Sequence, residues 1–307
     1  MKLNRQTTSP RHIRHGFSLI ELLVVIVIIG ILMALILPAL AAVRRRAAVS
    51  EQAAEFSKLD TAITQFTSDM GVEPSSELVV SEDASLASWD STPELILSRT
   101  RLRRIWPTFN FGGQIDFNAD GNFTGDASGG GTITLAGSEC LVFFLGGTLN
   151  RDTDGDGVVS AAEATGAPTH IGFSKNPINP CSMTGANRQT PWFTFDPDRL
   201  LDDDQDGMPG YYPTLGSRNV PIHFASSNNG QGYYAGAAIY VQADGRTPWN
   251  SNGHQLIAAG FDDELGFVPY PTSPAPRLVY VKTDSLNGRQ MELDNVTNFK
   301  AGSTLGD

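Results

Sequence analysis

The chain has 307 residues, a formal charge of −11 and only two cysteines, while glycine (31) and proline (18) are plentiful. Its first sixteen residues contain basic but no acidic side chains, so the remainder carries 18 basic and 33 acidic residues. An acidic body of this kind repels phosphate backbones, which argues against nucleic acid as a partner and favours cations such as calcium. The many glycines and prolines predict a body rich in turns.

A long apolar segment follows the basic residues 1–16. Residues 17–43 include a single charged side chain, Glu21, and a triple arginine at 44–46 comes next. As a helix this segment measures about 40 Å, which exceeds the roughly 30 Å of a bilayer core. We therefore expect one membrane-spanning helix. The positive-inside rule places residues 1–16 in the cytoplasm, although the arginines at 44–46 oppose that orientation.

The same segment also permits a second interpretation, a cleaved secretory signal peptide. Ala39, Leu40 and Ala41 form an A-x-A cleavage pattern, so signal-peptidase release would start the chain at Ala42. Against this interpretation, the apolar run 19–37 is longer than the apolar region of about 7–15 residues in a signal peptide.

The sequence GFSLIELLVVIVIIGIL at 16–32 closely resembles the leader-peptide junction of type IV pilins and type II secretion pseudopilins. The resemblance implies that a prepilin peptidase cuts after Gly16 and N-methylates Phe17. It also places the glutamate of that family at Glu21 and its helix-bending proline at Pro38. The implied segments are a leader (1–16), a transmembrane and assembly helix (17–43), an amphipathic continuation (44–70) and an extracytoplasmic body (71–307).

Glu21 needs a physical explanation because an ionised carboxylate in a membrane helix costs on the order of 2.5–3.5 kcal/mol at mid-depth. The amine that cleavage creates on Phe17 of a neighbouring subunit would pair with it and set the register of a helical polymer. The alternative is a protonated glutamate, or one that reaches the membrane surface. Pro38 lacks an N–H group, so we expect it to kink or locally unwind the helix.

An apolar stripe predicts that the helix continues to residue 70. Val49, Phe56, Ile63 and Met70 recur every seven residues, with two further apolar side chains between them, and Gly71 then ends the helix. The stripe would pack on a sheet of its own body, as in pilins, or form a coiled coil.

We also expect a helix to start at Thr92 and Pro93. Short strands are predicted at 131–135, 192–195, 220–225, 233–242, 255–261 and 278–281. The fold class is α+β, a long N-terminal helix on an antiparallel sheet.

Residues 152–163 match a twelve-position calcium loop. Hard oxygen donors at alternate positions around a tight glycine turn suit a cation that takes six to eight oxygens. The candidate ligands are Asp152, Asp154, Asp156, the carbonyl of Val158, Ser160 and the closing Glu163. A helix enters at 138–145, whereas Gly166 and Pro168 leave room for about one turn afterwards. We therefore expect a structural Ca²⁺ loop rather than a paired EF-hand, with Kd of order 10⁻⁴–10⁻³ M.

Three other acidic segments are weaker candidates. Asp202, Asp204 and Asp206 begin the same pattern, but Pro213 stands at position 12. Asp116, Asn118 and Asp120 also begin it, and Ala127 stands at position 12. Both loops are equally well interpreted as solvated Asx turns. The segment 254–266 resembles the C-terminal loop of major pseudopilins, which implies calcium ligands at Asp262, Asp263 and Glu264.

Two features of the body remain open between alternatives. Cys140 and Cys181 form either one disulfide or two buried thiols. The basic cluster Arg99, Arg101, Arg103 and Arg104 either pairs with carboxylates of its own body or contacts an acidic neighbouring subunit.

The sequence has no P-loop, no G-x-S-x-G elbow and no H-E-x-x-H motif, and its body histidines are isolated, so we do not expect an enzyme.

The resemblance implies a structural subunit of a type IV pilus-like or type II secretion pseudopilus filament. Its partners would be other copies or related pilin-like subunits, prepilin peptidase, an assembly platform with its ATPase, and membrane lipid. It would lie in the inner membrane with its body in the periplasm, or in a filament at the cell surface. The alternative is a membrane-anchored or secreted calcium-dependent binding domain, for example for carbohydrate, that does not polymerise. The residues that would then line a sugar-binding face are Trp192, Phe193, Tyr211, Tyr212, Tyr233 and Tyr234.

Overall fold

The computed structural model describes residues 18–83, 85–123, 131–154, 159–164, 168–217, 219–234, 236–267, 277–280 and 290–306. It divides into two compact units, Met1–Ala47 and Ala48–Asp307. The boundary lies inside the first helix, α1 (Leu19–Met70), so each unit contains part of α1.

In the first unit, α1 is apolar and exposed. The large apolar side chains from Leu19 to Val43 are all exposed, from 43% for Leu40 to 82% for Leu19. The helix continues through Pro38 without interruption. Of the two predicted effects of Pro38, a kink or local unwinding, the unwinding does not occur, because a proline removes only one N–H donor from the helix.

In the second unit, α1 buries the predicted stripe. Val49, Phe56, Ile63 and the two intervening residues Leu59 and Phe66 are at most 7% exposed, and Met70 packs against the same core. The helix ends where Gly71 takes a φ of +75° and donates its N–H to the carbonyl of Thr67 at 2.9 Å. The predicted end of the helix is confirmed, and glycine suits it because the left-handed conformation carries no Cβ penalty.

The remaining helices are short. They are α2 (Leu86–Trp89), α3 (Pro93–Ile105), α4 (Ser138–Gly146), α5 (Ala161–Ala164) and the 3₁₀ turns η1 (Pro197–Arg199) and η2 (Gln290–Glu292). At the start of α3 the Thr92 hydroxyl accepts a hydrogen bond from the N–H of Leu95 at 3.3 Å, and Pro93 occupies the first turn. The predicted helix start at Thr92 and Pro93 is confirmed.

Twelve strands are described. They are β1 (Glu77–Ser81), β2 (Thr132–Ala136), β3 (Leu149–Asn150), β4 (Thr169–His170), β5 (Leu200–Leu201), β6 (Gly210–Tyr211), β7 (His223–Ser226), β8 (Ile239–Val241), β9 (His254–Ala258), β10 (Arg277–Val279), β11 (Val296–Thr297) and β12 (Lys300–Thr304). The largest sheet has four antiparallel strands in the order β12-β11-β9-β7. The pairs β1-β2, β3-β4 and β5-β6 are antiparallel, and β10 pairs with β8 in parallel. The fold is α+β with antiparallel sheets as predicted, apart from that one parallel pair.

Some predicted strands are shorter or absent. No strand forms at 192–195, because the N–H groups of Trp192 and Phe193 both bond the carbonyl of Leu145 at the end of α4. The predicted strand 233–242 is reduced to β8, since a turn with a hydrogen bond from Ala237 N–H to the Tyr234 carbonyl precedes it.

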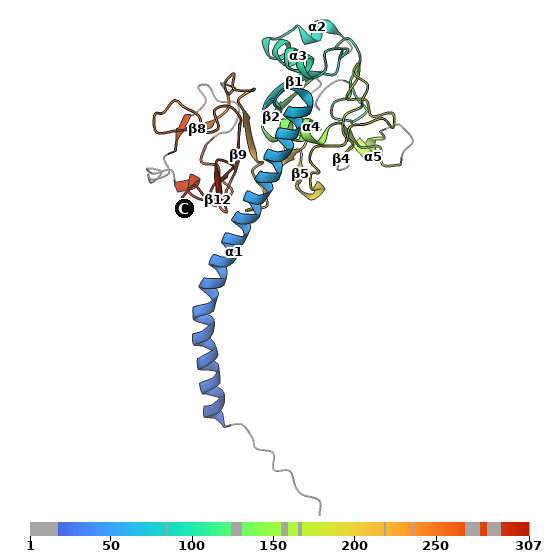
Figure 1. The fold of residues 1–307 in the computed structure, drawn as a ribbon. Coiled ribbons are helices and arrows are strands. Elements are labelled where there is room, and N and C mark those ends of the chain that lie inside the picture. Colours follow the sequence, from blue (N-terminus) through green and yellow to red (C-terminus); the bar gives the residue numbers. More distant parts are fainter. Residues whose placement is uncertain are drawn as a thin grey trace, which may run out of the picture. The chain divides into compact units, whose positions relative to one another are not determined.

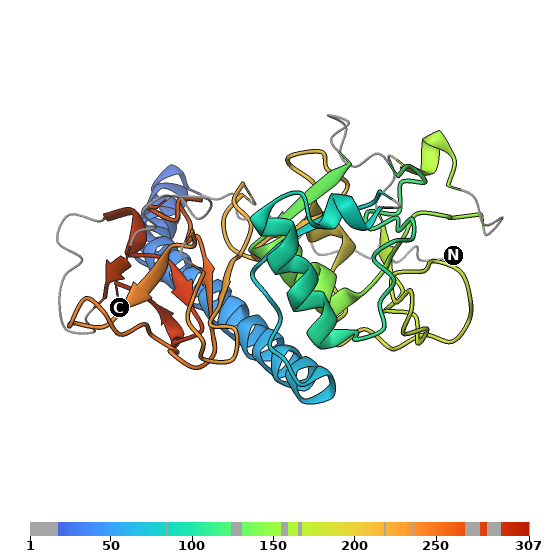
Figure 2. The same cartoon turned by 90° about the horizontal axis from the view of Figure 1, so that it is seen from above.

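Within the second unit, the C-terminal part of α1 runs between two groups of elements. The orange and red C-terminal strands lie on one side and the green and yellow segments on the other (Figures 1 and 2). One buried cluster joins them, and it includes Phe56, Leu59 and Phe66 of α1, Phe144 of α4, and Phe224, Leu256 and Val296 of the four-stranded sheet. The acidic loops therefore belong to a body whose core is built on α1.

Candidate functional site

The N-terminal part of α1 begins with a capping box. The backbone N–H and hydroxyl of Ser18 donate to Oε2 of Glu21 at 2.9 and 2.8 Å, and the Glu21 N–H donates to the Ser18 hydroxyl at 3.2 Å. Such reciprocal bonds satisfy donors that a helix start otherwise leaves unpaired. The candidate processing residues Gly16 and Phe17 lie outside the described residues. In this chain, Glu21 thus has a local partner in Ser18.

Three candidate ligands of the loop 152–163 converge. Carboxylate oxygens of Asp152, Asp154 and Glu163 lie within 4.8 Å of one another. The candidates Asp156 and Val158 lie outside the described residues. The structure thus brings the first and last positions of the predicted loop together.

Glu163 closes this loop through hydrogen bonds. Its Oε1 accepts the N–H and hydroxyl of Thr153 at 2.7 and 2.8 Å, and its Oε2 accepts the N–H and hydroxyl of Ser160 at 3.0 and 2.8 Å. The bonds from Ser160, followed by those from Thr153, lower the pKa of Glu163 to about 2. The closing carboxylate is therefore ionised at neutral pH, as a calcium ligand must be.

The loop after β5 forms a second cluster. Carboxylate oxygens of Asp202, Asp204 and Asp206 lie within 4.8 Å of one another. Asp202 accepts the N–H of Gly207 at 3.0 Å, and Asp206 accepts the N–H of Met208 at 2.8 Å. The two short strands β5 and β6 hold the ends of this loop together, although the loop lacks a closing carboxylate in sequence.

Glu139 on α4 is an acidic neighbour of this second cluster that the sequence patterns did not identify. Its Oε2 accepts the N–H of Ala136 at 2.9 Å. Burial raises the pKa of Glu139 to about 8, and the carboxylates of Asp206, Asp204 and Asp202 add to the increase. Glu139 lies in an apolar helix next to the buried Cys140. It is not part of a spaced acidic pattern, so the sequence does not indicate it as a ligand.

The loop 116–121 is built as a set of turns. Asp116 accepts the N–H groups of Asp120 and Gly121 at 3.2 and 2.9 Å, while Asn118 accepts the N–H of Asp120 at 3.1 Å. Burial, more than any other cause, raises the pKa of Asp116 to about 6. The Asn118 contact spans two residues, as in an Asx turn, whereas the Asp116 contacts span four and five residues, and both side chains are buried rather than solvated. Among the described residues, this loop is not one of the groups whose carboxylates converge on a common point.

The structure brings these loops together around one basic side chain, Arg151. Its Nε donates to the carbonyl of Asn118 at 3.1 Å, and its Nη2 donates to the carbonyl of Gly207 at 2.9 Å. The Asn118 amide donates in turn to the carbonyl of Asp206 at 2.9 Å. Arg151 directly precedes Asp152, so three loops that are far apart in sequence form one cluster.

The fourth candidate segment, 262–264, has a different arrangement. Both carboxylate oxygens of Asp263 accept the N–H of Ser217, at 2.7 and 2.8 Å, and Asp262 accepts the N–H of Glu264 at 2.9 Å. Asp294, which sequence reasoning missed, accepts the N–H of Phe261 at 2.6 Å. These carboxylates hold turns together, and the described residues of this segment form no convergent group.

The basic residues of α3 bind within their own body. Arg99 forms an ion pair with Asp90 at 2.6 Å, and Arg101 donates to the carbonyl of Glu77 at 2.7 Å. Arg103 lies 5.3 Å from the ring centre of Phe111, and Arg104 donates to Gln231 at 3.5 Å. These contacts favour the interpretation of internal pairing.

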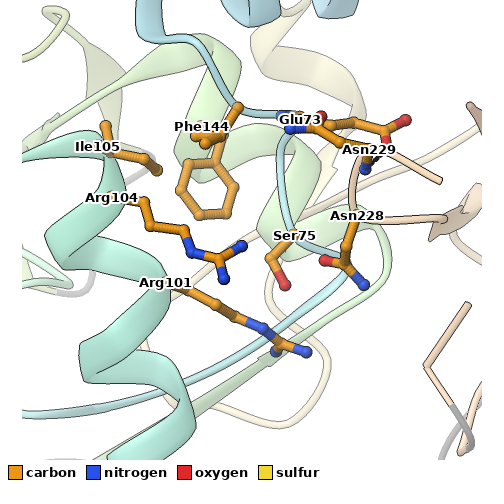
Figure 3. A pocket seen from close by; sticks show the side chains of 9 residues that line it. Glu73, Ser75, Arg101, Arg104, Ile105, Phe144, Asn228 and Asn229 are labelled. Carbon is orange, nitrogen blue, oxygen red and sulfur yellow. Dashed lines mark hydrogen bonds between the residues drawn. The ribbon is translucent and has the colours of Figure 1, made fainter. Parts of the chain in front are cut away.

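A small cavity lies beside these arginines (Figure 3). Its volume is about 30 Å³, enough for one or two waters and far below the several hundred Å³ of a ligand pocket. The cavity is lined by Val72, Glu73, Ser75, Arg101, Arg104, Ile105, Phe144, Asn228 and Asn229. In Figure 3 the side chains of Arg101 and Arg104 extend from α3 toward Ser75 and Asn228.

A wider polar groove of about 530 Å³ opens beside α1 and β9. Its lining comprises Asp60, Asn250, Ser251, Asn252, Gly253, His254 and Asn298, and it contains no Phe, Tyr or Trp. The aromatic residues considered as a sugar-binding face pack inward instead. Tyr211, Tyr212 and Tyr233 are at most 8% exposed, and Trp192 packs against the core.

Cys140 and Cys181 are both buried free thiols. The Cys140 thiol donates to the carbonyl of Leu135 at 3.3 Å. Of the two alternatives, the structure has the pair of thiols rather than the disulfide.

The N-terminal segment matches a known family model. The model describes the prokaryotic N-terminal methylation motif, and it matches residues 11–37. The chain carries a prepilin-type N-terminal methylation motif. This motif includes Gly16, Phe17 and Glu21, which confirms the resemblance found in the sequence. No curated protein and no solved structure matches the chain.

The methylation motif agrees with the fold around it. Helix α1, which contains most of the motif, is long and apolar enough to cross a membrane. A long N-terminal helix with antiparallel sheets is consistent with a pilin-like fold. Motif and helix together support a membrane-anchored substrate of prepilin peptidase, of the type IV pilin and pseudopilin type.

Proposed function

We propose that this protein is a structural, non-enzymatic subunit of a type IV pilus-like or type II secretion pseudopilus filament. The observation that carries the proposal is the methylation motif at 11–37, which leads through one uninterrupted helix into a folded body. Prepilin peptidase cuts after Gly16 and methylates Phe17. The subunit then remains anchored in the inner membrane with its body in the periplasm. An assembly platform and its ATPase add it to a filament.

In this proposal, Glu21 changes partner on assembly. Its carboxylate accepts the N–H and hydroxyl of Ser18 in the single chain. In the filament, the methylated amine of Phe17 on a neighbouring subunit supplies an opposite charge inside the apolar layer. A charged pair in lipid is much less costly than an isolated carboxylate, which gives the pairing its driving force.

The N-terminus of the mature protein tests the processing step. The full chain is expressed in a host with a prepilin peptidase, purified from membranes in detergent, and its N-terminal peptide is identified by mass spectrometry. We expect a chain that starts at methylated Phe17, and we expect a Gly16→Val variant to remain uncut. A chain that starts at Ala42 would instead support signal-peptidase release and the non-polymerising binding domain. An intact Met1 in the wild-type protein would contradict both schemes.

We further propose that the body binds structural calcium at the loop 152–163. The convergence of Asp152, Asp154 and Glu163 supports this site, since ionised carboxylate oxygens are the ligands that calcium prefers. Asp156, the Val158 carbonyl and Ser160 would complete the set by their positions in the twelve-residue pattern. Asp202, Asp204 and Asp206 are a second, less complete candidate site.

Calorimetric titration of the full chain with calcium chloride tests the loop 152–163. We expect binding with Kd of order 10⁻⁴–10⁻³ M, as in other extracellular loops of this type, and its loss in Asp154→Ala. Asp244→Ala is a matched control. Asp244 also holds a turn, by accepting the N–H groups of Arg246 and Thr247 at 2.9 Å each, but it belongs to neither convergent group. An unchanged heat in Asp154→Ala would exclude this loop as the site.

A further inference from the structure

Arg151 is a buried cation that contacts two acidic loops at once. Arg151 is only 5% exposed, and its guanidinium donates to the carbonyls of Asn118 and Gly207. These acceptors are 33 and 56 residues away in sequence. A guanidinium suits this arrangement because its donors form a rigid planar fork and its charge persists at every physiological pH.

The two loops also contact each other closely. The amide of Asn118 donates to the carbonyl of Asp206 at 2.9 Å. Gly207 has a φ of +88°, and a Cβ atom added there would lie 2.7 Å from the amide nitrogen of Asn118. A side chain at 207 would clash with the Asn118 side chain and would have to adopt a left-handed backbone conformation, so glycine suits this position.

Carboxylates of both loops act electrostatically on the guanidinium. Burial lowers the pKa of Arg151, and the carboxylates of Asp202, Asp120 and Asp116 oppose that decrease. Burying an arginine is costly unless opposite charges and hydrogen bonds compensate, and these loops supply both. The guanidinium thus places one positive charge beside two loops, at the carbonyls of Asn118 and Gly207.

We propose that Arg151 is the permanent cation that holds the loops 116–121 and 202–207 together, whether or not the loop 202–207 also binds calcium. In doing so, Arg151 also fixes the position of Asp152, the first candidate ligand of the neighbouring loop 152–163. The loop 116–121 reaches that third loop directly, since a Cβ added to Gly121 would lie 3.3 Å from the carbonyl of Val159. Arg151 is thus a positioning residue for the acidic cluster, and this role goes beyond the proposed calcium function.

Amide hydrogen exchange of the full chain in detergent and EDTA tests the proposal. Peptides that cover 116–121 and 202–208 report on the two loops in wild type, Arg151→Lys and Arg151→Met. Arg188→Met is a matched control, because Arg188 also donates to two carbonyls, those of Gly172 and Ser182, at 3.0 and 2.5 Å. Arg188 lies outside the three acidic loops.

We expect exchange in both loops to be at least about tenfold faster in Arg151→Met, since two charged hydrogen bonds are lost. Arg151→Lys should be intermediate, because an ammonium keeps the charge but cannot reproduce the fork, and Arg188→Met should leave both loops unchanged. If Arg151→Met does not fold, the exchange rates of Arg151→Lys relative to wild type test the proposal. Wild-type exchange rates in either loop of an Arg151 variant, or equal acceleration by Arg188→Met, would overturn the proposal.

The outcome is independent of calcium. The exchange comparison is made in EDTA, whereas the calcium proposal is tested by the heat of binding to the wild-type protein. If calorimetry detects no calcium binding, the calcium proposal fails but the exchange rates expected for the Arg151 variants stay the same. If the Arg151 variants exchange at wild-type rates, the Arg151 proposal fails but the calcium binding expected for the wild-type protein stays the same.

Discussion

Nε2 of His254 lies 2.7 Å from Oδ1 of Asp60, which connects strand β9 to helix α1. The other ring nitrogen, Nδ1, lies 3.3 Å from Oε1 of Glu73, just beyond the end of α1. A histidine between two carboxylates is held in its charged form. This imidazolium therefore ties both the middle and the end of the buried helix to the four-stranded sheet.

This arrangement predicts a loss of stability at alkaline pH. Burial by itself lowers the pKa of His254, but the hydrogen bonds and charges of Asp60 and Glu73 outweigh it and raise the pKa to about 9. A folded-state pKa above the ordinary 6.5 gives stability that is complete below about pH 6.5 and is lost as the pH rises through 9. At about 1.4 kcal/mol per pKa unit, the effect is on the order of 3 kcal/mol.

Urea denaturation of wild type and His254→Gln between pH 6 and 10 measures this contribution. We expect the variant to lack the alkaline decrease. His223→Gln is the control, because burial lowers the pKa of His223 to about 4, so that its contribution is lost only as the pH falls below about 6.5. An alkaline decrease of equal size in His254→Gln would refute the assignment.

A second prediction concerns the ion pair of Glu55 on α1 and Arg199. Arg199 binds both carboxylate oxygens of Glu55, with Nη2 2.7 Å from Oε2, and the Tyr211 hydroxyl donates to Oε1 at 2.8 Å. The side chains of Arg199 and Glu55 are only 5% and 12% exposed. Arg199→Met should destabilise the protein by about 3–5 kcal/mol, because it leaves a buried carboxylate without its cation.

The double variant Glu55→Gln, Arg199→Met should recover part of this loss, since no unpaired charge remains. Arg99→Met is the control, because Arg99 and Asp90 form a more exposed pair, for which we expect about 0–1 kcal/mol. Chemical denaturation of the four proteins compares the free energies of unfolding. Equal losses in Arg199→Met and Arg99→Met would contradict the predicted role of the buried pair.

A third prediction separates the two roles of Glu21. Ser18→Ala removes the capping hydroxyl but keeps the carboxylate, whereas Glu21→Gln keeps a capping side chain and removes the charge. We expect filaments from Ser18→Ala and none from Glu21→Gln or Glu21→Ala, since only charge pairs with the amine of Phe17. Sheared filaments are quantified by immunoblot after processing is verified by mass spectrometry. Normal assembly of Glu21→Gln would limit Glu21 to its capping role.

A fourth prediction concerns the two cysteines. Burial raises the pKa of both thiols, and neither side chain is accessible, so the folded protein should react very slowly with iodoacetamide. After denaturation without reductant, we expect two labels per chain by mass spectrometry. No label under these conditions would show that Cys140 and Cys181 form a disulfide.

The sequence predicted the features that depend on local signals. The end of α1 at Gly71, the start of α3 at Thr92 and Pro93, and the helix α4 follow from caps and apolar patterns within a few residues. The loop 152–163 could be found for the same reason, because its candidate ligands are contiguous in sequence.

Features that depend on long-range contacts were not predictable. Trp192 and Phe193 have the composition of a strand, yet their N–H groups bind the end of α4. Arg151 precedes Asp152 as a lone basic residue in an acidic stretch, and this position could have indicated a pairing with acidic loops. Its contacts with Asn118 and Gly207, however, require knowledge of how three distant loops fold together.

The polar contacts of α1 with the body also determine how the helix responds to tension along its axis. Gln52, Glu55, Asp60 and Asp69 each bind a different segment, through Thr214, Arg199, His254 and Trp192. They are spread over about 26 Å of helix at about 1.5 Å per residue, and helix side chains project outward from the axis. A pull along the helix therefore loads these bonds in shear and simultaneously, instead of peeling them apart one after another.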